Sequence, residues 1–79
     1  MLNPVHLRTF SVVCPTGTFA VAARELGYTP SAVSQQIVGL ERATGLTLFE
    51  RVPNGVRPTR IAQVLVERSD GVLGARADR

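Results

Sequence analysis

Cysteine and histidine are almost missing from this sequence, which has one of each, Cys14 and His6. A disulfide within the chain needs two cysteines, and a structural zinc site takes four cysteine or histidine ligands, so neither can be built here. The sequence also offers no nucleophile with a general base in reach, so we predict no enzyme, no metal and no cofactor. Cys14 ends an apolar stripe and is interpreted as a packing residue rather than a redox sensor.

Long hydrophobic runs are absent as well. No segment approaches the roughly 20 apolar residues that a membrane-spanning helix needs, and Met1–Pro4 lacks the features of a signal peptide. We therefore expect a cytoplasmic protein with no membrane partner. With 79 residues, the chain is expected to form one small domain with a thin core.

Lysine is absent too, so all nine basic residues are arginines, and the net charge is +3. Outside residues 42–60 the charged residues cancel. Inside that stretch only Glu50 opposes four arginines, so the excess charge is local, as a phosphate-contacting surface requires. These arginines are Arg42, Arg51, Arg57 and Arg60.

The first half of the chain predicts two short helices. One is expected over Asn3–Cys14, capped by Asn3 and stopped by Pro15 and Gly17. Its buried stripe is expected to contain Leu7, Phe10, Val13 and Cys14.

The second helix is expected over Phe19–Leu26, with Thr18 as its N-cap and Gly27 in the left-handed conformation that ends it. The small side chains of Ala22 and Ala23 allow it to pack closely against the helix that follows.

A third helix begins at a defined residue, because Thr29 can cap it and Pro30 suits its first position. At about 100° per residue, Val33, Ile37 and Leu40 share one face, which we expect to be buried. The opposite face has no acid between Ser31 and Val38 and would fit a major groove without repelling phosphate, although a face that merely meets water is the simpler alternative. This exposed face is expected to carry Ser31, Ser34, Gln35, Val38 and Arg42.

A hairpin follows, because Pro53, Asn54 and Gly55 form a turn signal between apolar residues. Arg51 and Arg57 flank its tip. We therefore predict a mainly α fold. It is a winged helix-turn-helix of three helices plus a two-stranded wing, because a helix, a turn and a second helix with an exposed polar face are followed by a basic hairpin.

The last segment predicts a linker helix capped by Thr59. No other segment of the chain is left to cover its apolar stripe, so we expect this helix to pair with the same helix of a second copy. Such a dimer would place the third helices of the two copies about 34 Å apart, the spacing of successive major grooves. A frayed tail is the alternative. The predicted dimerisation residues are Ile61, Val64, Leu65 and Val72.

Several motifs together resemble the N-terminal DNA-binding domain of LysR-type transcriptional regulators, over nearly the whole chain. The resemblance implies a domain that binds promoter DNA as a dimer, then a linker helix, then an effector-binding domain. We accordingly expect a DNA-binding unit over residues 1–58 and a linker over 59–79, without the effector domain; a small-molecule effector is implied only if such a domain exists. The motifs are FAVAAREL at Phe19–Leu26, SAVSQQI at Ser31–Ile37, Leu40-Glu41, GLTLFER at Gly45–Arg51 and GVRPT at Gly55–Thr59.

Three positions depart from the family pattern. Gln35 stands where Arg or Lys is usual. A guanidinium that could donate two hydrogen bonds to guanine is thereby replaced by an amide better suited to adenine. Pro30-Ser31 stands where Gln-Pro is frequent, and Asn54 where the wing tip often carries Arg. A sequence preference different from that of common family members is therefore expected.

The predicted function is sequence-specific binding of double-stranded DNA by a dimeric transcriptional regulator. Ser34 and Gln35 are expected at base edges and Asn54 at the wing tip. The alternative is a winged-helix module that docks a protein through the face containing Val38. The expected phosphate contacts are Thr18, Ser31, Arg51 and Arg57, and the wider DNA-facing set adds Thr29, Pro30, Val38 and Arg42.

Overall fold

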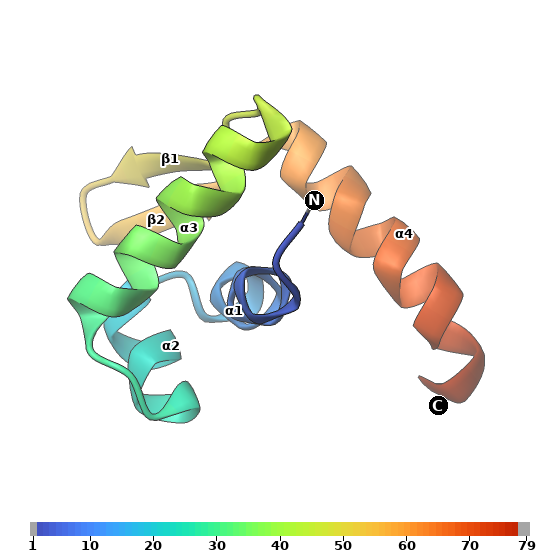
Figure 1. Ribbon diagram of the computed structural model, residues 1–79, viewed down its shortest axis with the longest axis horizontal. Helices are drawn as coiled ribbons and strands as arrows, with labels where there is room; N and C mark the ends of the chain where they lie inside the picture. The colour runs from blue at the N-terminus through green and yellow to red at the C-terminus, as the bar shows by residue number, and fades with distance from the viewer. Residues whose placement is uncertain (1, 78–79) are drawn as a thin grey trace.

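Three short helices, a hairpin and a longer fourth helix follow one another along the chain. This computed structural model describes the backbone of residues 2–77 and the side chains of residues 2–68. The hairpin lies beside the third helix, and the fourth helix runs down the other side of the molecule (Figure 1), which confirms the predicted winged helix-turn-helix. The elements are α1 (Pro4–Thr16), α2 (Phe19–Leu26), α3 (Pro30–Thr44), β1 (Phe49–Val52), β2 (Gly55–Pro58) and α4 (Arg60–Ala77).

The first three helices begin at the predicted caps, where a side-chain oxygen accepts a backbone N–H of the first turn. α2 ends at Gly27, whose φ of +79° is the expected left-handed conformation. The cap bonds join Asn3 Oδ1 to the N–H of Val5 (2.8 Å), Thr18 Oγ1 to that of Val21 (3.0 Å) and Thr29 Oγ1 to that of Ala32 (3.1 Å).

The predicted buried stripe of α1 was partly wrong. Leu7 is 40% exposed and Cys14 only half-buried, whereas Thr9 is buried with Phe10 and Val13. Thr9 is tolerated in the core because its hydroxyl donates to Oε1 of Gln36 on α3. The buried face is thus rotated toward α2 and α3, the two elements that cover it.

α1 also ends later than predicted. Pro15 lies inside the helix, which continues to Thr16 before Gly17 turns the chain with a φ of +78°. Proline has a helical φ, and in the last turn its missing N–H removes only one hydrogen bond, so it does not stop the helix there.

The wing is an antiparallel hairpin in which Val52 pairs with Gly55, so Pro53 and Asn54 form the tip. Phe49 fixes its base, because its ring packs edge-to-face on Phe10 and Phe19, at centroid distances of 5.7 and 6.2 Å.

The second strand of the wing is tied to the corner between α1 and α2. The N–H of Val56 donates to the carbonyl of Gly17 at 2.9 Å. A Cβ at Gly55, whose φ is +150°, would lie 2.2 Å from that carbonyl oxygen. Only glycine allows this approach, so the wing is held against the helices.

The face of α4 that packs on the core overlaps in part with the one predicted to pair with a second copy, because both include Leu65. Ala62 is fully buried, and Leu65 and Val66 pack against the core, whereas Ile61 is 40% exposed. Leu65 therefore serves its own chain's core, because the helix is rotated to bring the Ala62–Val66 side inward. Val72 lies outside the residues whose side chains are described. Over the described residues, no helix is long and apolar enough to cross a membrane.

Candidate nucleic-acid interface

The outward face of α3 carries the predicted residues with one difference. Ser31, Gln35 and Arg42 are exposed, and Val38 is 41% exposed. Ser34 is only half-buried, because it lies at the edge of this face, about 100° around the helix from buried Val33.

The hydroxyl groups of Thr18 and Thr29 stand at the starts of α2 and α3. Each oxygen accepts a backbone N–H of its own helix, so its O–H remains able to donate to another acceptor. Thr29 and Pro30 are exposed and Thr18 is half-buried. These positions suit an anion near a helix N-terminus, where the backbone dipole favours negative charge.

The two wing arginines differ in their electrostatic surroundings. Glu50 pairs with Arg57 across the hairpin, and Nη2 of Arg57 lies 2.9 Å from Oε1 of Glu50. Both side chains are more than half exposed, so this ion pair contributes little to stability, but it offsets the charge of Arg57. The net charge of residues 42–60 already counts Glu50, but the ion pair shows that Arg57 contributes less of the excess positive charge than the other arginines of this stretch.

Arg51 lies on the other face of the hairpin. It pairs with Val56, and alternation along the strand puts it on the same face as Phe49, nearer the tip. Phe49 and Val56 pack against the core, while Arg51 is exposed. Arg51 thus extends the core-facing side of the wing, and exposed Asn54 completes the tip.

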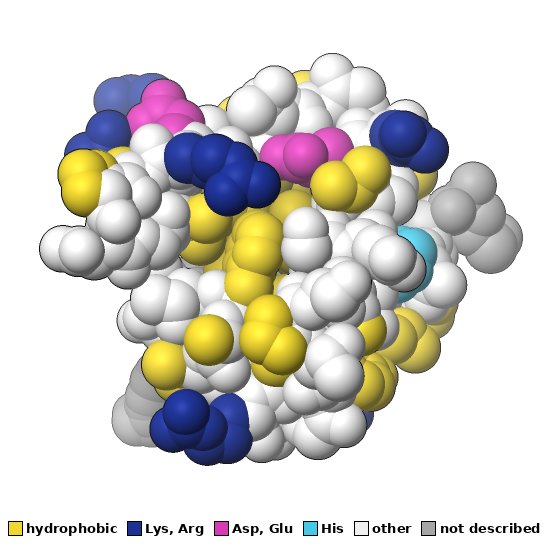
Figure 2. All heavy atoms as spheres, turned by 90° about the vertical axis from the view of Figure 1, so that its left-hand side faces the viewer, with side chains coloured by type: hydrophobic (Ala, Val, Ile, Leu, Met, Phe, Trp, Pro, Cys, Tyr) yellow, Lys and Arg dark blue, Asp and Glu magenta, His cyan; other side chains and the backbone are white. Residues whose placement is uncertain are grey.

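Figure 2 shows the side of the molecule that holds the wing tip and the start of α3. Hydrophobic side chains line a hollow in its middle, and arginines lie around it, with acidic side chains beside some of them along the upper edge. The arginines around this hollow are the groups on this side that can attract a polyanion.

Glu41 is a residue of this site that the sequence reasoning missed. From the last turns of α3, its Oε2 accepts the N–H of Leu48 at 2.7 Å and that of Phe49 at 3.3 Å. Since these amides start the wing, one carboxylate fixes the wing relative to α3. The sequence did contain a signal for this role. Glu41 directly follows buried Leu40 and so lies close to the core face of the helix, where a carboxylate is not expected to be fully solvated.

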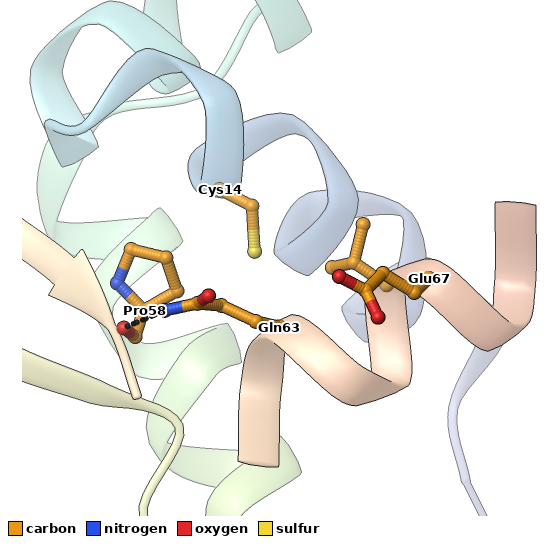
Figure 3. Close-up of a pocket in the computed structure, with 5 residues that line it drawn as sticks. Cys14, Pro58, Gln63 and Glu67 are labelled. Atoms are coloured by element: carbon orange, nitrogen blue, oxygen red, sulfur yellow. Dashed lines mark hydrogen bonds between the residues drawn. The ribbon is translucent and has the colours of Figure 1, made fainter. Parts of the chain in front are cut away.

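A separate pocket of about 210 Å³ lies between the end of α1 and the first turns of α4 (Figure 3). Burial raises the pKa of the Cys14 thiol, which points into it, to about 11. The thiol therefore stays protonated and unreactive near neutral pH, consistent with a packing role. No group of three or more metal-ligating side chains occurs among the described residues.

The sequence matches the family of bacterial regulatory helix-turn-helix proteins of the lysR type over residues 4–63. The chain belongs to the LysR family. It is 46% identical, over 72 residues, to the HTH-type transcriptional regulator AceR of Acinetobacter baumannii, covering 91% of this chain and 24% of AceR. It is 38% identical to the putative regulator PtxE of Stutzerimonas stutzeri, covering 98% of this chain and 39% of PtxE. The chain thus spans well under half the length of these LysR-family relatives.

Solved structures of the LysR family share the fold. The DNA-binding domain of CbnR in complex with DNA superposes with a TM-score of 0.80 and 26% identity, over 94% of this chain and 85% of that one. The BenM DNA-binding domain bound to a benA site gives 0.80 and 28%, over 94% and 83%. OxyR of Corynebacterium glutamicum gives 0.84 and 29%, over 96% of this chain and 24% of that one.

Proposed function

We propose that this LysR-family chain binds double-stranded promoter DNA, with α3 in the major groove and the wing beside the phosphate backbone. The observation that carries the proposal is the exposed face of α3, free of acids from Ser31 to Val38, next to the exposed Arg51 of the wing. The DNA complexes of CbnR and BenM, whose domains have the same fold, support it.

The exposure of each side chain suggests its role. Gln35 projects from the middle of the face and suits an adenine edge, while half-buried Ser34 lies at the border of the face and suits a base at the edge of the contact. Arg51 is proposed to contact a backbone phosphate, and Asn54 at the wing tip is proposed to contact the groove next to the one that α3 enters. The remaining phosphate contacts are assigned to Thr18, Thr29, Ser31, Arg42 and Arg57.

A salt series tests the proposal against a protein-docking module. Because DNA binding releases counterions, the logarithm of the affinity for a duplex should fall linearly and steeply with the logarithm of salt concentration. A contact dominated by apolar area would not show this dependence. A chain with no measurable affinity for any duplex at low salt would rule out the proposed function.

Replacing Gln35 by alanine should weaken binding to a duplex selected from a random pool by about 1 to 3 kcal/mol and relax preference at one base pair. The amide would no longer bond the base, while the phosphate contacts would remain. Competition titrations with single-base variants of the duplex measure this. Equal losses on selected and random duplexes would show that Gln35 does not read a base.

The ion pair in the wing predicts opposite effects for its two members. Glu50→Gln should free Arg57 for a phosphate, tighten binding to all duplexes and steepen the salt slope. Arg57→Ala should weaken binding to all duplexes alike and flatten the slope, by up to about one unit. Fluorescence anisotropy at several salt concentrations measures both. If Glu50→Gln left affinity and slope unchanged, the wing's outer face would not contact DNA.

We further propose that the protein acts as a homodimer in the cytoplasm, in a regulatory rather than a catalytic role. Residues 1–58 would form the DNA-binding unit and residues 59–79 the linker and dimerisation segment. The exposed Ile61 and half-buried Val64 on one side of α4 support this, because solvent-facing aliphatic side chains on a helix favour a partner.

A further inference from the structure

One large hydrophobic side chain interrupts the polar outer face of α3. Val38 is 41% exposed and lies near the centre of that face, between Gln35 one turn before it and Arg42 one turn after it. The core face of the same helix, with Val33, Ile37 and Leu40, is already covered. Val38 is not part of the core cluster, so its exposed methyl groups are available to an apolar group outside the chain.

The major groove offers one such group. Among the base edges that face it, thymine alone carries a methyl group, at C5, while the other features are hydrogen-bond donors and acceptors. A valine in the middle of α3 can pack on that methyl group without taking the place of a hydrogen-bond partner of a polar base atom. The amide of Gln35, next to it, matches the N6 and N7 atoms of adenine.

We propose that Val38 is a specificity-determining residue that contacts a thymine methyl, so that α3 selects A·T pairs beneath Gln35 and Val38. The inference rests on the proposed function, because α3 must enter the major groove. Charge favours DNA over an apolar protein partner as the occupant: exposed Arg42 lies on the same face of α3 one turn after Val38, and α3 has no acid from Ser31 to Val38.

Deoxyuridine tests the inference, since it lacks only the methyl group and keeps every hydrogen-bonding atom of thymine. A duplex selected from a random pool by the wild-type chain is remade with dU at one thymine at a time, and each affinity is measured. At one position the wild type should lose about fourfold, the value of one buried methyl group. Val38→Ala should bind the unmodified duplex more weakly and be insensitive to dU at that position.

Two control variants make the result specific. Gln35→Ala should keep the dU effect, because it removes a different contact. Val21→Ala, at a valine on α2 with a similar exposure of 38%, should also keep it. Binding to the selected duplex with no dU-sensitive position, or with equal sensitivity in Val38→Ala, would overturn the role of Val38. Failure to enrich or bind any duplex would instead refute the proposed function.

Discussion

Replacing Ile61 by aspartate should dissociate the proposed dimer and lower the affinity for a duplex with two half-sites by about 10²- to 10⁴-fold, toward that of a single half-site. Ile61 is 40% exposed, so its change spares the core of the chain. In a helix pair its carboxylate would become a buried, unpaired charge, which costs several kcal/mol. Near the start of α4 an acid does not weaken the helix itself, because it complements the helix dipole.

Sedimentation velocity and titrations with one-site and two-site duplexes measure the outcome. Ile61 is a sharper choice than Leu65, because Leu65 packs against the core and an aspartate there would also unfold the monomer. Val21→Asp adds the same charge at a comparably exposed position on α2 and should leave the sedimentation coefficient unchanged. A wild-type chain that sediments as a monomer at high concentration and binds two half-sites without cooperativity would contradict the dimer.

Replacing Glu41 by alanine should lower the free energy of unfolding by about 2 kcal/mol, because it leaves buried backbone donors without their charged acceptor. Leu48 is fully buried and its hydrogen bond to the carboxylate is partly buried, so water replaces this acceptor less well than at an exposed N–H. A domain of this size is expected to have a stability of only about 5 to 10 kcal/mol. Thermal unfolding followed by circular dichroism should therefore show a Tm lower by about 10 °C.

Two variants separate this effect from a general loss of charge. Glu41→Gln keeps a carbonyl oxygen that can accept the same N–H groups but without the negative charge, so its Tm should lie between those of wild type and Glu41→Ala. Glu25→Ala removes an exposed carboxylate from α2 and should change Tm little. Equal melting of the Glu25 and Glu41 alanine variants would mean that the carboxylate does not hold the wing.

The starts of the helices and the turn of the hairpin follow from local sequence. Thr18 and Thr29 start α2 and α3, Gly27 ends α2, and the Pro53-Asn54 tip reverses the chain, because caps and turns act through atoms only a few residues apart. The outward face of α3 was predictable for a related reason. Its covered side is defined by a regular apolar stripe, and the opposite side follows from helical geometry alone.

The buried sides of α1 and α4 depend on tertiary packing, because the apolar residues of each helix cover a wide arc and the packing partner selects among them. Thr9 is buried and Leu7 is not, since Gln36 on α3 satisfies the threonine hydroxyl. The roles of charged residues were decided in the same way. Glu41 binds the amides that begin the wing and Glu50 neutralises Arg57, contacts between residues seven or more apart that no local pattern encodes. The Glu41 contacts form when the start of the hairpin packs against α3, and the Glu50–Arg57 pair forms when the two strands of the hairpin pair with each other.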